Sequence, residues 1–161
     1  MTVIAVTGHM DLTEESVALI REELVVLLSP YAEEGLTGVS CIAKGADALF
    51  ADTVLSLGGG LIVVVPSQDY REAKVKADYA AEFDRLHHAA SEVAVMPYAE
   101  ANREAYEAAN SELLRRADRL VAVWDGRPGN GRGGTADTVA EARAKGLSVD
   151  VIWPVGAARK G

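Results

Sequence analysis

The segment from residue 126 to 143 reads GRPGNGRGGTADTVAEAR, and its glycine-rich loop runs directly into an alanine-rich helical pattern. Gly133, Gly134 and Thr135 stand at the junction. The first N–H groups of a helix have no partner within the helix, and its dipole is positive there, so such a junction attracts anions. Glycine lets a ligand approach the backbone closely, and Thr135 can cap the helix, bind a phosphate oxygen, or do both. The pattern predicts a phosphate site.

Two cations in the same loop strengthen this interpretation. Arg127 and Arg132 lie among Gly126, Gly131 and the following glycines, in a chain of formal net charge −8. Guanidinium groups bind phosphate through charge-assisted hydrogen bonds. The alternative is a surface turn without a ligand. The loop does not match the G-x-x-x-x-G-K-[ST] pattern of ATP-hydrolysing proteins, and no G-x-G-x-x-G follows the first strand.

Short apolar runs alternate with helical patterns along the chain, and the strands and helices they predict must position the site. The runs are nearly continuous in hydrophobicity, which is typical of parallel strands covered on both faces. We predict an α/β fold: one doubly wound Rossmann-like domain over residues 1–156, with a mostly parallel sheet of about six strands, helices on both faces, and a flexible tail at 157–161. The predicted strands are Thr2–Thr7, Val39–Ala43, Leu61–Val65, Val93–Met96, Leu120–Trp124 and Val149–Trp153.

Five helical segments are expected between these strands. Thr13 is the predicted N-cap of the first, with an apolar stripe through Val17, Ile20, Leu24 and Leu28, and Pro30 is expected to stop it. The others are Ala46–Leu57, a loop followed by a helix within Tyr70–Ala90, Asn102–Ala117, and a helix after the glycine loop that Gly146 ends.

In doubly wound sheets, ligands bind beyond the carboxyl ends of the strands, where the strand order reverses. Polar and glycine residues follow four of the predicted strands, and we expect them to meet at one edge of the sheet. The candidate binding residues there are Thr7, Gly8, His9, Lys44, Gly45, Asp47, Pro66, Ser67, Asp125 and Gly126, which join those of the glycine loop.

Several of these residues have a purely structural alternative. Gly8 could only turn the chain, although its position also lets backbone N–H groups face an anion. His9 could be a loop histidine whose hydrogen bonds are all made within the protein, or it could donate a hydrogen bond to a phosphate or ribose. Asp47 could cap the following helix or contact a ribose or base. Lys44 could be a solvated surface lysine.

The composition is that of an ordinary globular domain: 161 residues, 49% apolar, 25% charged, with a pI near 4.9. The acidic balance disfavours general binding to nucleic acid or anionic membranes. The N-terminus lacks the features of a signal peptide, and the single Cys41 is expected to be a buried thiol, which suits a cytoplasmic protein. His87 and His88 stand alone on a helix, so we predict no metal site and no resident cofactor.

Three motifs together resemble the SLOG superfamily, which is named for the Smf/DprA DNA-processing proteins and the lonely-guy (LOG) phosphoribohydrolases. They are VTGHMDL at residue 6, KGADALFAD at residue 44 and ADRLVAVWDGRPGNGRGGTADTVAEARAKG at residue 117. The resemblance spans nearly the whole chain and is strongest to small stand-alone bacterial members. It implies a Rossmann-like fold that binds a nucleotide or nucleotide-derived ligand, with phosphate at Gly133–Thr135. It also implies a homo-oligomer.

The sequence departs from these relatives at two places. Met10 stands where the small SLOG proteins often have an arginine. Thr138 stands where the PGGxGTxxE motif of LOG enzymes has its catalytic glutamate. The neighbouring Asp137 is rotated about 100° around a helix and should not replace it, while Glu141 is better explained as part of a solvated face. The phosphate site is therefore expected without the usual catalytic acid.

The last motif also resembles nucleoside deoxyribosyltransferases and related N-glycosidases, which take their nucleophilic glutamate from another segment. Glu82, Glu100, Glu104 and Asp125 are the candidate carboxylates, since cleavage of an N-glycosidic bond needs a carboxylate near the anomeric carbon. Three hypotheses remain: a nucleotide-binding or sensing protein, which we favour; a nucleoside monophosphate N-glycosidase; and a structural or interaction domain without a ligand.

Overall fold

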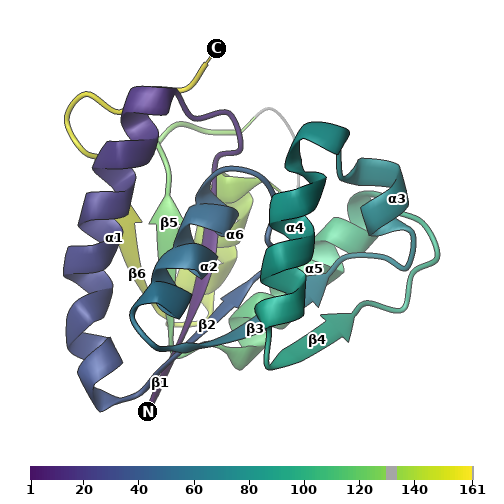
Figure 1. Ribbon diagram of the computed structural model, residues 1–161, viewed down its shortest axis with the longest axis horizontal. Helices are drawn as coiled ribbons and strands as arrows, with labels where there is room; N and C mark the ends of the chain where they lie inside the picture. Colours follow the sequence, from purple (N-terminus) through teal and green to yellow (C-terminus); the bar gives the residue numbers. More distant parts are fainter. Residues whose placement is uncertain (130–133, 161) are drawn as a thin grey trace.

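The computed structural model describes residues 1–129 and 134–160 and contains one six-stranded sheet in which every neighbouring pair is parallel (Figure 1). The strand order is β4-β3-β2-β1-β5-β6, so the order reverses between β1 and β5. The predicted fold class is confirmed. The strands are β1 (Thr2–Gly8), β2 (Leu36–Ser40), β3 (Gly60–Val65), β4 (Glu92–Val95), β5 (Arg119–Val123) and β6 (Ser148–Ile152).

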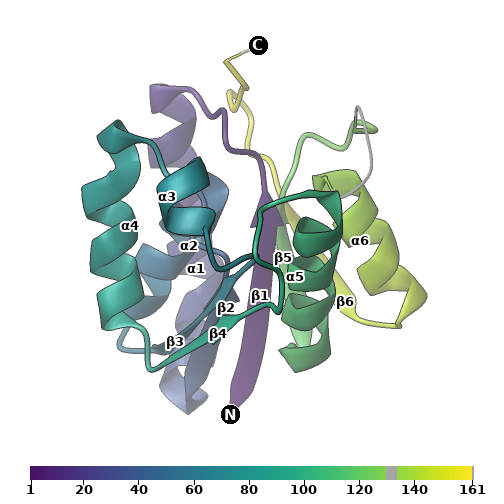
Figure 2. The same ribbon diagram turned by 90° about the vertical axis from the view of Figure 1, so that its right-hand side faces the viewer.

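Helices cover both faces of the sheet (Figure 2). The helices α1, α2 and α4 lie on one face, over two buried apolar clusters, and α5 and α6 lie on the other face, over a third. Among the described residues no helix is both long enough and apolar enough to cross a membrane. The bounds are α1 (Glu14–Glu34), α2 (Ala46–Ser56), α3 (Tyr70–Lys74), α4 (Ala77–Ala89), α5 (Arg103–Arg116) and α6 (Thr135–Ala144).

The first helix begins as predicted but does not end at Pro30. The Thr13 hydroxyl accepts a hydrogen bond from the Ser16 N–H at the N-cap, and Ile20, Leu24 and Leu28 are buried. The helix continues through Pro30 to Glu34. The expected stop is wrong because Pro30 lies on the exposed side, where the carbonyl group that loses its helical partner faces water.

The second strand ends three residues earlier than its apolar run suggests. The chain turns after Ser40, whose hydroxyl accepts the Ile42 N–H and donates to the Asp47 carbonyl oxygen. Ile42 has φ 48° yet is fully buried. Its hydrophobicity therefore reports burial in the core, not membership of the strand. The expected loop after Tyr70 is instead the short helix α3, followed by α4.

Residues 157–160, which the sequence predicts as a flexible tail, are hydrogen-bonded across the β1–α1 loop. The Ala158 carbonyl oxygen accepts the Thr13 N–H at 3.2 Å, and the Ala158 N–H donates to Ser16 Oγ at 2.7 Å. The Lys160 N–H donates to the Asp11 carbonyl oxygen at 2.7 Å. We call residues 157–160 the C-terminal strap. Its contacts are mostly through the backbone, which side-chain composition does not reveal.

Candidate functional site

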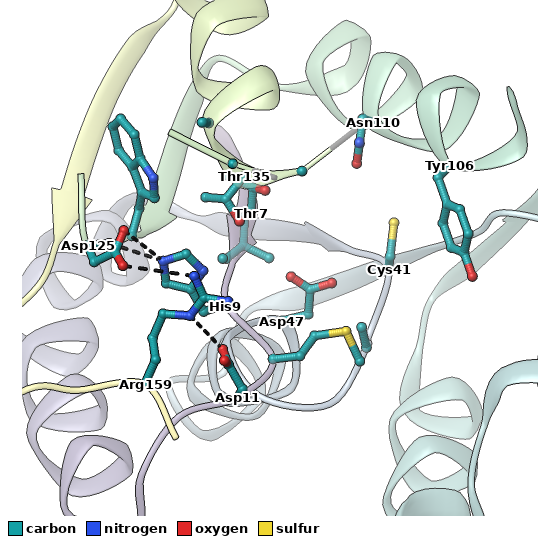
Figure 3. Close-up of a pocket in the computed structure, with 18 of the residues that line it drawn as sticks. Thr7, His9, Asp11, Cys41, Asp47, Tyr106, Asn110, Asp125, Thr135 and Arg159 are labelled. Carbon is teal, nitrogen blue, oxygen red and sulfur yellow. Dashed lines mark hydrogen bonds and ion pairs between the residues drawn. The ribbon is translucent and has the colours of Figure 1, made fainter. Parts of the chain in front are cut away.

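A cavity of about 1150 Å³ opens at the carboxyl ends of the strands, around the point where the strand order reverses. It is bounded by the end of β1, the segment after β5, the N-terminus of α6, one side of α5, and the C-terminal strap. This is the place where doubly wound sheets bind their ligands. Figure 3 shows 18 of the residues that line it.

Most of the predicted site residues that the structure describes line this cavity, and four do not. Those that line it are Thr7, Gly8, His9, Asp47, Pro66, Asp125, Arg127, Gly134 and Thr135. Those outside the lining are Lys44, Gly45, Ser67 and Gly126. Gly131, Arg132 and Gly133 lie outside the described residues.

Three of the residues outside the lining have contacts elsewhere in the fold. Lys44 is exposed and its Nζ lies 3.4 Å from Asp78 Oδ2. Ser67 is fully buried and donates a hydrogen bond to Asp69 Oδ1 at 2.7 Å. Gly45 has φ +91°, and a Cβ there would lie 2.7 Å from the His9 carbonyl oxygen. Only glycine fits at that approach between the β1–α1 loop and the start of α2.

Gly8 lines the cavity and also has a packing role. A Cβ at this position would lie 2.5 Å from Ala46 Cβ and 2.8 Å from the Val123 carbonyl oxygen. The absent side chain therefore lets α2 begin close to β1 and β5. Gly8 is the last residue of β1 and packs against α2 and β5, and its role in facing an anion stays a prediction.

The N-terminus of α6 faces the cavity through Gly134, Thr135 and Ala136. Gly134 is the N-cap and supplies no side-chain oxygen to the first turn. A Cβ at Gly134 would meet no atom within 4 Å. The backbone at this end of the helix is therefore open to a ligand of negative charge.

Thr138 does not face the cavity. It is only 2% exposed, and its hydroxyl donates to the Gly134 carbonyl oxygen at 3.1 Å. Asp137 is exposed and is not part of the lining, and Glu141 interacts with Ser111 and Lys145 on the helix surface. None of these three positions supplies an acid to the cavity.

His9 is held at the cavity wall by the segment after β5. Its Nε2 accepts the Asp125 N–H at 3.2 Å, and its ring meets the Trp153 ring edge-on, with centroids 5.6 Å apart. Burial lowers the pKa of His9, and the positive charge of Arg159 adds to this, while Asp125 opposes it. We therefore assign a neutral ring at pH 7, with its proton on Nδ1 and the Nε2 lone pair facing Asp125.

Arg159 of the C-terminal strap links two carboxylates at the cavity (Figure 3). Its Nε lies 2.8 Å from Asp11 Oδ1, and its guanidinium group reaches to 3.9 Å from Asp125 Oδ2. The hydrogen bond from Arg159 is the main cause that lowers the pKa of Asp11. Burial opposes ionisation of Asp125, but the Arg127 N–H, His9 and Arg159 together lower its pKa.

Asp47 lines the cavity from the first turn of α2. Burial raises the pKa of its carboxyl group to about 7, while a hydrogen bond from the Ala43 N–H acts in the opposite direction. Cys41 and Tyr70, both buried, line the same part of the cavity, and burial is the main cause that raises the pKa of each. The predicted burial of Cys41 is confirmed.

Several lining residues were not predicted as site residues from the sequence. Trp124 and Trp153 directly follow β5 and β6, so the rule about strand ends could have identified them. The residues contributed by α5 lie at helical spacing, which the sequence alone does not distinguish from a core stripe. The lining residues missed include Met10, Asp11, Tyr70, Lys74, Tyr106, Ala109, Asn110, Leu113, Trp124, Trp153 and Arg159.

The candidate carboxylates on the helices lie elsewhere. Glu82 pairs with Arg85 on α4, and Glu100 and Glu104 are exposed, and none of the three lines the cavity. Within residues 1–129 and 134–160, no group of three or more His, Cys, Asp or Glu side chains could hold a metal ion.

No model of a known protein family and no curated protein sequence matches this chain. Several solved structures match it in fold. DNA processing protein A (DprA) from Streptococcus pneumoniae matches with TM-score 0.69 and 17% identity, over 97% of this chain and 52% of that one. DprA from Helicobacter pylori matches with TM-score 0.70 and 15% identity, over 98% of this chain and 68% of that one. The present chain thus spans about half the length of the Streptococcus protein.

A molybdenum cofactor carrier protein from Chlamydomonas reinhardtii matches with TM-score 0.59 and 20% identity, over 93% of this chain and 75% of that one. At these identities the comparisons establish the fold. The chain has the doubly wound Rossmann-like fold with its cavity at the reversal of strand order. DprA is one of the proteins for which the SLOG superfamily is named, so the resemblance seen in the sequence motifs is confirmed at the level of the fold.

Proposed function

We propose that the protein binds a nucleotide or nucleotide-derived phosphate ligand in the cavity at the carboxyl edge of the sheet. The observation that carries this proposal is the N-terminus of α6: Gly134, Thr135 and Ala136 line the cavity, and the N-cap Gly134 has no side chain with which to cap the helix. The phosphate group of the ligand binds at this end, where backbone N–H groups and the helix dipole favour an anion. Arg127 adds positive charge at the same wall.

The rest of the cavity suits the remainder of a nucleotide. Its lining combines aromatic rings from Tyr70, Tyr106 and Trp124 with carboxyl groups from Asp47 and Asp125. Flat rings offer apolar contact to a base, and carboxyl groups offer hydrogen-bonding partners to a base or sugar. A mixed lining of this kind is typical of sites that orient a small ligand with few polar contacts.

Binding without turnover is the form of this function that the residues favour. Thr138 stands at the position of the LOG glutamate and is buried with its hydroxyl bound to the backbone. A nucleoside monophosphate N-glycosidase is the second candidate, because the carboxyl groups of Asp11, Asp47 and Asp125 all line the cavity. A structural or interaction domain without a ligand is the third.

One experiment separates these candidates. The protein is incubated with nucleoside monophosphates, cyclic nucleotides and ADP-ribose-type ligands, and thermal shift and release of free base are measured on the same samples. Binding predicts a raised Tm with at least one ligand and no release of base. Base release that disappears in Asp47→Asn or Asp125→Asn would instead establish the N-glycosidase. No shift with any ligand would favour a structural domain.

The proposal also includes expectations about nucleic-acid binding, oligomeric state and cellular location. DprA from Helicobacter pylori is described as binding single-stranded DNA, but the present chain carries a net charge of −8, which disfavours general nucleic-acid binding. We therefore expect a single-stranded oligonucleotide added to the ligand panel to give no shift at 150 mM salt. We also expect a homo-oligomer, which light scattering on the purified protein tests, and a cytoplasmic location, which cell fractionation tests.

A further inference from the structure

Asp47 differs from the other two acids of the cavity in its partners. Asp11 pairs with Arg159, and Asp125 accepts the Arg127 N–H and lies 3.3 Å from His9 Nε2. Asp47 accepts a hydrogen bond from the Ala43 N–H, and among the described residues it forms no ion pair with a cation. Its carboxyl group points into the cavity, as Figure 3 shows.

Apart from the Ala43 N–H and the N-terminal end of α2, the groups around Asp47 carry no positive charge that would stabilise a carboxylate. Cys41, Tyr70 and Tyr79 are coupled to it electrostatically, and all three are neutral at pH 7. Two cations stand on neighbouring elements: Lys44, which is exposed and paired with Asp78, and Lys74, which is exposed on α3. The other titratable neighbours are Tyr106 on α5, whose pKa is raised, and His9 in the loop after β1, whose pKa is lowered. Asp47 is only half-buried by solvent accessibility, but its carboxyl group is desolvated by these neighbours and therefore favours its neutral, proton-bearing form.

We propose that Asp47 recognises a nucleobase as a neutral carboxyl group. Its O–H donates to a ring nitrogen of the base, and its carbonyl oxygen accepts from the adjacent amino group. Adenine presents this edge through N1 and the 6-amino group, and cytosine through N3 and the 4-amino group. This inference rests on the proposed function, because it assigns the base to the Asp47 end of the cavity and the phosphate to the N-terminus of α6.

The surroundings of Asp47 support a base in preference to a sugar. Tyr70 and Tyr106 line the same cavity, and their rings lie edge to face with centroids 6.4 Å apart. Aromatic rings provide apolar contact to a planar heterocycle. The two N–H donors of a guanine edge would instead need the two acceptor oxygens of an ionised carboxylate, which desolvation disfavours. The raised pKa of Asp47, about 7, agrees with this assignment.

The test is a calorimetric titration at pH 6 and pH 8 with AMP, CMP, GMP and ribose 5-phosphate. The phosphate group ionises similarly in the three nucleotides, so the ratio of AMP to GMP affinity isolates the base. We expect that ratio, and the ratio of CMP to GMP, to fall about tenfold from pH 6 to pH 8, as the fraction of protonated Asp47 falls. Ribose 5-phosphate should show no such change.

Asp47→Asn is the informative variant, because an amide keeps one donor and one acceptor but does not titrate in this range. It should bind AMP at pH 6 about as well as the wild type and should lose the pH dependence of the ratio. His9 is unchanged in this variant, so its own titration remains as an internal control. Asp47→Ala should lose the preference for AMP and CMP over GMP, provided that circular dichroism shows it folded.

Two results would overturn the inference. One is nucleotide binding with an AMP to GMP ratio that does not change with pH in the wild type, a measurement that needs no variant. The other is an Asp47→Asn protein that loses ribose 5-phosphate as strongly as AMP, which would place Asp47 at the sugar. Absence of binding by all four compounds would contradict the proposed function itself, so the two failures are distinct.

Discussion

The Thr138 hydroxyl donates to the Gly134 carbonyl oxygen one turn earlier in α6, so this side chain is turned toward the backbone and the core. The cavity nevertheless contains acids, and they come from three other segments of the chain. At the scale of single residues, the difference between binding and catalysis therefore depends on Asp11, Asp47 and Asp125. Arg159 lowers the pKa of both Asp11 and Asp125, whereas the pKa of Asp47 is raised, and it is the acid whose protonation the fold changes most.

The raised pKa of Asp47 predicts a pH-dependent loss of stability. The folded state binds the proton more tightly than the unfolded state, whose pKa is near 3.8, so stability falls as pH rises from about 4 to about 7. Asp47→Asn removes this cost and should raise the free energy of unfolding at pH 8 by on the order of 1–3 kcal/mol, with little change at pH 4. Urea denaturation at the two pH values measures the difference. A variant less stable than the wild type at pH 8 would contradict the assignment.

At the scale of elements, the start of α2 is fixed by two close backbone approaches. Gly45 brings α2 against the His9 and Met10 backbone, and the Ala46 N–H donates to the His9 carbonyl oxygen at 3.1 Å. The position of His9 at the cavity wall therefore depends on a glycine that does not line the cavity. The sequence marked Gly45 as a binding residue because glycine, polar side chains and a strand end coincide there, but the structure gives it a supporting role.

Gly45→Ala tests this support against a matched control. Gly45 and Gly58 both have positive φ, +91° and +83°, but a Cβ at Gly58 would meet no atom within 4 Å. Gly58→Ala should therefore cost only backbone strain, about 1 kcal/mol, whereas Gly45→Ala also forces backbone apart and should cost about 3 kcal/mol. Chemical denaturation of both variants measures the gap. Equal losses would show that the close approach at Gly45 has no energetic consequence.

The sequence predicted the elements better than their ends. Parallel strands buried on both faces produce continuous apolar runs, and helices between them produce amphipathic stripes, so all six strands and the principal helices were recognisable. The bounds predicted for β2 from the apolar run Val39–Ala43 are wrong, because the buried Ile42 belongs to the core but does not pair in the sheet. The predicted end of α1 at Pro30 is wrong because the effect of a proline depends on which side of the helix faces water.

At the scale of the whole molecule, residues distant in sequence complete the cavity. The C-terminal strap crosses the β1–α1 loop and brings Ala157, Ala158 and Arg159 into the lining. The strand-end rule identified lining residues of the cavity that directly follow a strand, such as His9 and Asp125. The strap and the α5 side chains could not be found in this way, because their place depends on tertiary packing.

Removal of residues 157–161 should therefore affect both stability and binding. The deletion leaves Ser16 Oγ and the Thr13 N–H without their strap partners and opens one wall of the cavity. We expect a loss of about 2–3 kcal/mol in the free energy of unfolding and a weaker affinity for the ligand. Arg159→Ala is the control: it removes only the exposed ion pair and should cost less than about 1 kcal/mol. A deletion variant with unchanged stability and affinity would show that the strap is dispensable.

The most direct test of the central claim is a binding titration on Gly134→Val with the nucleotide that gives the largest thermal shift. Gly134 has φ −85° and open space around its Cα, so the fold tolerates a side chain, but that side chain would stand where the phosphate meets α6. Ala140→Val, on the exposed side of the same helix, is the control. We predict that Gly134→Val keeps the wild-type circular dichroism and abolishes binding, while Ala140→Val binds normally. A folded Gly134→Val protein that binds the nucleotide with wild-type affinity would contradict the account.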